Sequence, residues 1–357
     1  MDIRSATRSY ESWLARQTDV VPGNLRLKHA RMRESAFVFL RGTFYRWMTE
    51  WSVVCADLAD APRVCAVGDL HLENFGTWRD AEGRLIWGVN DLDEACVLPY
   101  TQDLVRLATS AVLATRSNHL ALSRRAACDA IVDGYVASLE RGGRPIVLAE
   151  RQRWLRALAE NDLRDPVRFW TNLQALAPAK RGVPHRVLRS SLPDPKLSYR
   201  VVRRIAGVGS LGRPRFVALA EWGGALVARE AKARVPSAAA WATGADRSST
   251  RHVDVASTLL TKAARVADPY FWIRDGWIVR RLAPDCARIE LSELPKRRDE
   301  AKLLRAMGWE AANLHLAAGT RRIGRDLRGR PSRWLRTAAG AMAESVEHDW
   351  RSWTRDR

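Results

Sequence analysis

The 357-residue sequence has few of the features that mark secreted, membrane-spanning or zinc-binding proteins. Its five cysteines are scattered and form no CxxC pair, which argues against a zinc knuckle or a disulfide framework and fits a reducing compartment. No stretch approaches the ~20 apolar residues that span a bilayer, and the amino terminus lacks the apolar core of a signal peptide. We therefore expect a soluble, cytoplasmic protein without a membrane partner.

Acidic residues are outnumbered: 40 Asp and Glu stand against 59 Lys and Arg, which gives a net charge of +19. Clustered arginines would favour a nucleic-acid partner, because neutralised phosphates release counterions. Here the arginines are spread through almost every segment, and no DNA- or RNA-reading motif accompanies them. This distribution favours a solvated arginine-rich surface over a nucleic-acid-binding face. A positive cleft that attracts an acidic or phosphorylated substrate is a further interpretation.

Secondary-structure patterns divide the chain into parts. With 46% hydrophobic residues, the chain can bury a sizeable core, as one bilobal unit or two closely packed domains. Helical patterns dominate the first half, β-prone runs follow, and two helices at about 296–318 and 332–353 close the chain. Prolines mark the connection between the halves. We predict an α+β fold with four parts: a helical lobe at 1–177, a linker at 178–196, a small β-rich lobe at 197–285, and C-terminal helices at 286–357 that complete the large lobe.

Two acidic turns form the most informative pattern in the sequence. Residues 67–74 (VGDLHLEN) contain Asp69 and, five positions later, Asn74; an apolar strand at 84–89 then leads to Asp91. Asp69 suits the orientation of an attacking hydroxyl, and the side-chain oxygens of Asn74 and Asp91 suit Mg²⁺ held against nucleotide phosphates. The alternative is a pair of Asp-rich turns that cap strands. The order and spacing of the turns favour a phosphoryl-transfer site with ATP and Mg²⁺ as cofactors.

These segments resemble known kinase-like families. Residues 68–74 and 90–95 are similar to the catalytic and metal-binding loops of aminoglycoside phosphotransferases and other small-molecule kinases of the protein-kinase-like fold. Together with residues 31–42, they resemble more closely a bacterial kinase-like family labelled domain of unknown function 2252, and this resemblance covers most of the chain. It implies a bilobal protein-kinase-like fold and an ATP site, while the family label supplies no substrate. It also implies a supporting role for Asp103, just past the metal turn.

A glycine-rich loop supplies the second half of a nucleotide site. It follows the β-prone run 197–205, and further β-prone runs flank the glycine pair at 223–224, so the loop opens a β-hairpin. A Rossmann fingerprint would need a helix after the glycines. We predict that the loop backbone approaches the phosphates of ATP. The loop residues assigned to this role are Gly207, Gly209, Ser210 and Gly212.

The remaining elements of a small lobe follow in order. A helix at about 251–264 is expected to pack on the sheet, and an Asp-Gly pair at 275–276 is a strong hairpin signal between the runs 270–274 and 277–282. Five strands and one helix result. The segment 282–285 would be the hinge beside an adenine ring, by analogy with kinases. Ordinary kinases place the glycine loop before the catalytic loop, whereas this chain places it after, so we predict a circular permutation.

The phosphate-binding cation has two candidates. Arg229 stands where the lysine of the third kinase strand usually lies, and Lys232 is the alternative. Side chains alternate along a strand, so the two would point to opposite faces and only one would reach the phosphates. The partnering glutamate of the packed helix is missing, and Asp254 is its shorter substitute.

The sequence therefore predicts an ATP- and Mg²⁺-dependent phosphotransferase that acts on a hydroxyl of a small molecule. Two alternatives stay open. The atypical cation and the missing glutamate also fit an ATP-binding pseudokinase or a nucleotidyltransferase. The basic composition also fits a nucleic-acid-binding or scaffold protein.

Overall fold

The structure is a computed structural model that describes residues 1–149, 152–159, 165–244, 254–286, 299–318 and 321–355. Within these residues, α-helices combine with antiparallel sheets, so the expected α+β class is confirmed. None of the described helices has the length and hydrophobicity that a transmembrane span requires.

The described helices begin at favourable caps in several places. Asp2, Ser35, Ser123, Asp165, Asp254 and Asp299 each accept a hydrogen bond from a backbone N–H of the first turn. In chain order the helices are α1 (Ile3–Ala15), α2 (Pro22–Arg31), α3 (Ala36–Gly42), α4 (Phe44–Val54), α5 (Tyr100–Arg116), α6 (Arg124–Glu140), α7 (Arg153–Ala159), α8 (Pro166–Gln174), α9 (His185–Ser191), α10 (Ala238–Thr243), α11 (Val255–Lys262), α12 (Glu300–His315), α13 (Arg321–Gly329) and α14 (Trp334–Arg355).

The strands form three sheets within the described residues. A two-stranded pair joins β1 (Arg63–Ala66) and β4 (Cys96–Pro99). A three-stranded sheet has the order β2 (Phe75–Arg79), β3 (Leu85–Val89) and β5 (Ile146–Val147). The largest sheet has the order β6 (Tyr199–Arg203), β7 (Arg215–Trp222), β8 (Ala225–Ala233), β10 (Trp277–Leu282) and β9 (Trp272–Arg274). All five strands predicted for this part of the chain are present.

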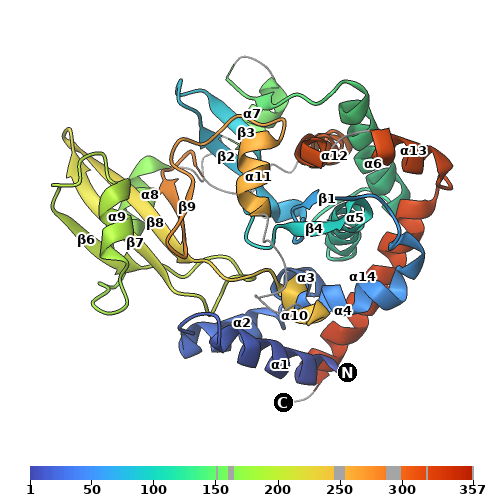
Figure 1. The fold of residues 1–357 in the computed structure, drawn as a ribbon, viewed down its shortest axis with the longest axis horizontal. Coiled ribbons are helices and arrows are strands. Elements are labelled where there is room, and N and C mark those ends of the chain that lie inside the picture. The colour runs from blue at the N-terminus through green and yellow to red at the C-terminus, as the bar shows by residue number, and fades with distance from the viewer. Residues whose placement is uncertain (150–151, 160–164, 245–253, 287–298, 319–320, 356–357) are drawn as a thin grey trace.

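The five-stranded sheet carries a helix on each face. Figure 1 shows this sheet with α8 and α9 on the left, and α5, α6, α12, α13 and α14 on the right. Alternate residues of each strand point to opposite faces. One face packs with α9 through Phe216, Ala218, Ala231 and Val279. The other packs with α8 through Val217, Leu219, Ala228 and Leu282.

The helix that covers the sheet is not the one predicted. The predicted helix 251–264 corresponds to α11, since residues 251–253 lie outside the described residues, and α11 contacts β1 and β4. Its buried residues Val255, Ala256 and Leu259 belong to the core of the helical end. The sheet is covered instead by α9, which lies within the predicted linker 178–196 and buries Val187 and Leu188 against β8 and β10. A short apolar pair inside a proline-rich stretch was sufficient to form a packed helix.

The helical end contains the larger core. α5 is buried along almost its whole length, with α6 and α14 packed against it, and α12 packs along α6. The predicted closing helices are present as α12 and α14, while residues 296–298 of the first prediction lie outside the described residues. α5 directly follows the second acidic turn and β4, so its polar side chains can reach both acidic turns.

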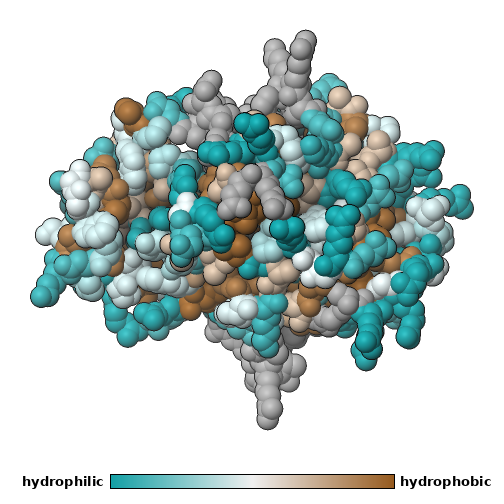
Figure 2. Space-filling model, turned by 90° about the horizontal axis from the view of Figure 1, so that it is seen from above, coloured by the Kyte–Doolittle hydropathy of each residue, from teal (hydrophilic) through white to brown (hydrophobic). Residues whose placement is uncertain are grey.

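Polar side chains are widely distributed on the surface. Figure 2 shows hydrophilic residues over both the sheet-containing end and the helical end of one face, with hydrophobic residues between them. Several arginines lie in internal ion pairs. These pairs include Arg46–Asp349, Arg106–Asp69, Arg213–Glu94, Arg215–Glu230 and Arg280–Glu230.

Candidate active site

Asp103 on α5 holds the first acidic turn in place through hydrogen bonds to its backbone. The two carboxylate oxygens of Asp103 accept hydrogen bonds from Val67 N (2.7 Å) and Gly68 N (2.8 Å). His315 Nε2 lies 2.9 Å from Asp103 Oδ2, and both side chains are fully buried. Gly68 has φ +79°, and a Cβ there would lie 2.4 Å from Glu94 O. Only glycine fits this conformation beside the second acidic turn, so the turn presents Asp69 at a fixed position.

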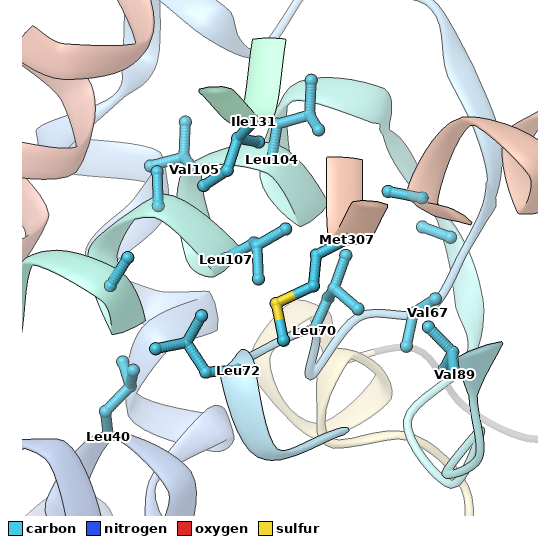
Figure 3. Close-up of a cluster of buried hydrophobic side chains, with 14 of the residues drawn as sticks. Leu40, Val67, Leu70, Leu72, Val89, Leu104, Val105, Leu107, Ile131 and Met307 are labelled. Carbon is cyan, nitrogen blue, oxygen red and sulfur yellow. The ribbon is translucent and has the colours of Figure 1, made fainter. Parts of the chain in front are cut away.

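An apolar cluster supports the same turn. Figure 3 shows Leu70 and Leu72 pointing into the core beside Leu107 and Met307. Leu70 and Leu107 are completely buried, and Leu72 is almost so. The turn that carries Asp69 is therefore fixed on a packed apolar layer.

Asp69 is gripped on one oxygen only. Arg106, which is fully buried on α5, contacts Asp69 Oδ1 with Nε at 2.7 Å and Nη2 at 2.5 Å, and Nη2 also donates to Leu40 O at 2.9 Å. Asp69 Oδ2 accepts no hydrogen bond from any described residue, although His71 Nε2 lies 4.0 Å away. Burial raises the pKa of Asp69 above its ordinary value, while Arg106 opposes the shift. A fixed carboxylate with one unused oxygen is suited to accept a proton.

Asn74 connects the two acidic turns. Its Nδ2 donates to Asp69 O (2.9 Å), and its Oδ1 accepts from Asp91 N (3.0 Å). The backbone repeats the link, because Asn90 N donates to Asn74 O at 3.1 Å. A carbonyl oxygen has two lone pairs, so Asn74 Oδ1 keeps one for a further ligand. The turns predicted separately from the sequence thus form one unit.

The second acidic turn faces Lys232 on β8. Lys232 Nζ lies 3.4 Å from Asp91 Oδ1 and 2.5 Å from Asp93 Oδ2. Burial disfavours ionisation of Asp91, but Lys232, a hydrogen bond with Asp93 and the more distant Arg280 and Arg215 together hold the pKa of Asp91 below its usual range. Burial and the neighbouring Asp91 raise the pKa of Asp93. Asp91 is also the more accessible of the two, with 44% of its side chain exposed against 9% for Asp93.

The side-chain oxygens of Asn74 and Asp91 suit a magnesium ion, which is seldom held by protein ligands alone. Asn74 and Asp91 supply oxygen atoms, as Mg²⁺ prefers, and Mg²⁺ commonly retains waters and completes its shell with substrate phosphates. Among the described residues, no three His, Cys, Asp or Glu side chains form a metal-binding group.

The glycine loop lies directly against the first acidic turn. It connects β6 to β7, and a Cβ on Gly209 would lie 3.0 Å from Arg41 O and 3.5 Å from Asp69 Oδ2. At its end, Gly212 O accepts from Val21 N at 2.9 Å. Ser210 Oγ accepts from Arg215 Nη2 at 2.6 Å. The structure thus brings the loop and Asp69 together.

Arg229 does not join this group. Its Nε donates to Ser191 O (2.9 Å), and its guanidinium lies 4.4 Å from the ring centroid of Tyr270, on the α9 face of the sheet. Asp254, the expected substitute for the missing glutamate, instead pairs with Arg234 at 2.8 Å and caps α11. Of the two candidate cations, only Lys232 points towards the acidic turns.

Asp69, Asn74, Asp91 and residues 207–210 of the glycine loop line a cleft of about 790 Å³. Both ends of the molecule contribute to it: the acidic turns and α2 from the helical end, and the glycine loop and β10 from the sheet. The predicted hinge borders it at Leu282 and Pro284, and Asp285 O accepts from Thr77 Oγ1 at 2.7 Å. Its apolar lining includes Phe169, Leu173, Leu176, Ile205, Leu282 and Pro284. Small-molecule sites commonly combine an apolar lining with a few polar groups.

Residues 18–180 and 189–356 match the sequence model of a family described as "Uncharacterized protein conserved in bacteria (DUF2252)". The chain belongs to this family. The DUF2252 match includes both acidic turns in its first range and the glycine loop with Lys232 in its second, so it covers both walls of the cleft. Neither a curated protein nor a solved structure matches the chain.

Two residues of this DUF2252 site were missed by the sequence analysis. Arg106, which grips Asp69, stands three positions after Asp103 on a helix that is otherwise apolar or small in its buried residues. Lys28 and its neighbours on α2 line the cleft but precede every recognised motif. Charged residues spaced three apart within a wholly buried helix were the available signal for Arg106.

Proposed function

We propose that the protein is an ATP- and Mg²⁺-dependent phosphotransferase with a circularly permuted, protein-kinase-like fold, related to the small-molecule kinases that its acidic turns resemble. The observation that carries the proposal is the convergence of Asp69, Asp91 and the glycine loop on one cleft, with Lys232 from a distant strand 3.4 Å from Asp91. A structural pair of Asp-rich turns would not need a cation from a distant strand beside one and a glycine loop beside the other.

The sheet order supports the permuted arrangement. The glycine loop joins the first two strands, and Lys232 lies on the third, as expected for a kinase small lobe. The catalytic turn precedes this sheet in the chain yet lies against its loop. The two faces can meet in this way in either chain order.

Each group has a distinct role in the proposed reaction. Asp69 Oδ1 is held by Arg106, so Oδ2 receives the proton of the acceptor hydroxyl. That hydroxyl oxygen bonds to the γ-phosphorus, the bond from phosphorus to the bridging oxygen breaks, and ADP leaves with the electron pair. Lys232 and the glycine loop bind phosphate oxygens. When bound through Asn74 and Asp91, Mg²⁺ would neutralise charge on those oxygens.

ATP binding is the first test. We expect MgATP to raise the melting temperature of the wild-type protein and expect Asp91→Ala to remove the Mg²⁺-dependent part of the shift. The control, Asp133→Ala, changes a carboxylate that is 65% exposed on α6 and should bind like wild type. Absence of any shift in the wild type would refute the nucleotide site. Salt-sensitive DNA or RNA binding, unaffected by Asp91→Ala, would then favour a scaffold.

Transfer is the second test. Incubation with MgATP and a panel of hydroxyl compounds should yield a phosphorylated product, and Asp69→Asn should reduce its formation by about a hundredfold or more while MgATP still binds. Binding without any product across the panel would favour the pseudokinase interpretation. The double contact of Arg106 with Asp69 Oδ1 is the feature that favours this second candidate, because it restrains the carboxylate.

A further inference from the structure

Two cations on α2, Lys28 and Arg31, line the cleft. Lys28 is 2% exposed, and Arg31 follows it three positions later on the same helical face. Neither side chain forms a hydrogen bond or ion pair with any residue that the structure describes. Lys28 Nζ lies instead 5.8 Å from the ring centroid of Tyr10 and 5.5 Å from that of Tyr45. Both tyrosines also line the cleft.

The other cations nearby are already paired. Arg41 Nη1 lies 2.5 Å from Glu73, and Arg213 Nη2 lies 2.7 Å from Glu94. Lys28 and Arg31 are therefore the lining cations on this side of the cleft that have charge left for a ligand. Buried charges are normally paired, because desolvation without a partner is costly. An anionic ligand would supply a partner for Lys28 and Arg31.

α2 has a fixed place in the site. Its N-cap residue Val21 donates from N to Gly212 O at 2.9 Å, and a Cβ on Gly212 would lie 2.5 Å from Leu25. The helix thus rests against the end of the glycine loop. Burial lowers the pKa of Lys28 to about 8, while the carboxylates of Glu11, Glu94 and Asp69 oppose the shift. Lys28 consequently remains largely cationic at neutral pH.

We propose that Lys28 and Arg31 bind an anionic group, a carboxylate or a phosphate, of the acceptor whose hydroxyl lies at Asp69. This rests on the proposed function. We assign the nucleotide phosphates to the glycine loop and to Lys232, which lies at Asp91 on the second acidic turn. Lys28 and Arg31 lie on α2 and line the same cleft as Asp69. The acceptor class is then a small anionic hydroxyl compound, not a polycation such as an aminoglycoside.

Anion binding can be measured without turnover. Inorganic phosphate and glycerate are the two probes, and glycerol is the uncharged match to glycerate. We expect wild-type protein to bind both anions, and Lys28→Met to weaken them by about tenfold or more, since a charge-assisted hydrogen bond contributes roughly that factor. Glycerol should not bind. Lys262→Met, on the exposed end of α11, is the matched control and should leave both affinities unchanged.

The relative affinities of the anions and the effects of the variants decide the proposal. If phosphate binds better than glycerate, the anionic group is a phosphate; the reverse order identifies a carboxylate. If Lys28→Met leaves both anions unchanged, or weakens MgATP as much as the anions, the acceptor subsite is refuted.

Lys232→Met should retain anion binding, which separates this site from the nucleotide phosphates. Arg31→Met, a partly exposed position, provides the same test if Lys28→Met does not fold. Anion binding without MgATP binding would refute the proposed function alone.

Discussion

Lys232 on β8 lies 3.4 Å from Asp91 on the second acidic turn, although 141 residues separate them in the sequence. The pair joins the five-stranded sheet to the helical end at the cleft. Arg229 lies on the same strand, but its side chain points to the opposite face of the sheet and contacts α9. The register of β8 against β7 and β10 decides which cation serves the cleft.

Substitution of the two cations should separate ligand binding from stability. We expect Lys232→Met to weaken MgATP by about tenfold or more, because a phosphate-binding charge is lost. Arg229→Met should leave MgATP affinity nearly unchanged but lower the free energy of unfolding by about 1–3 kcal/mol, since Ser191 O loses its donor. Isothermal titration and urea unfolding provide the two measurements. The opposite ranking in titration would assign the phosphates to Arg229.

The sequence could predict the strands of this sheet but not what packs on them. Alternation and the Asp-Gly turn at 275–276 define β9 and β10 locally, and alternation also requires Arg229 and Lys232 to face opposite ways. Which face meets the cleft depends on tertiary packing. α9 was missed because seven residues among prolines have little helical signal of their own, and contact with the sheet stabilises it.

The acidic turns could be singled out from the sequence, while their supports could not. Asp69, Asn74 and Asp91 were selected by residue type and spacing, and the structure brings them together. Arg106 and Lys28 carry no comparable pattern, because a charge in a helix has no meaning until its neighbours are known. Their roles come from long-range contacts, which a single sequence does not specify.

Gly68 and Gly83 provide a comparison between strain and crowding. Both have positive φ, +79° and +74°, so alanine costs about 1–2 kcal/mol at either position from backbone strain. A Cβ at Gly68 would also lie 2.4 Å from Glu94 O, whereas nothing lies within 4 Å at Gly83. We expect Gly68→Ala to lower the free energy of unfolding by a further ~1–3 kcal/mol. Equal losses in urea unfolding of the two variants would show that the turns do not press together.

Asp103 should be more important than its distance from the cleft suggests. Asp103→Asn keeps one acceptor for Val67 N and Gly68 N but turns a donor towards the other, and it weakens the contact with His315. We expect a loss of about 2–4 kcal/mol in the free energy of unfolding, because buried donors lose their partner. Asp133→Asn, on the exposed face of α6, is the control and should change stability by less than about 0.5 kcal/mol. A loss no larger than that of the control would contradict the supporting role.

Glu310 should make stability depend on pH near neutrality. It is 1% exposed on α12, where Oε2 accepts from Asn313 Nδ2 at 2.9 Å. Burial raises its pKa to about 7, while the nearby Arg265 opposes the shift. The folded protein therefore keeps a proton that the unfolded chain has released, so the stability from this group is present below pH 4.5 and is lost as the pH rises through about 7.

Glu310→Gln mimics the protonated side chain and removes this dependence. The free energy of unfolding of the variant relative to wild type should rise between about pH 5 and pH 8, by at most about 3 kcal/mol, because each pKa unit corresponds to ~1.4 kcal/mol. Urea unfolding at both pH values measures the difference. Glu344→Gln, on the exposed face of α14, should give a difference that is flat with pH. A flat difference for Glu310→Gln as well would mean that Glu310 is ionised in the folded protein and that Arg265 balances its burial.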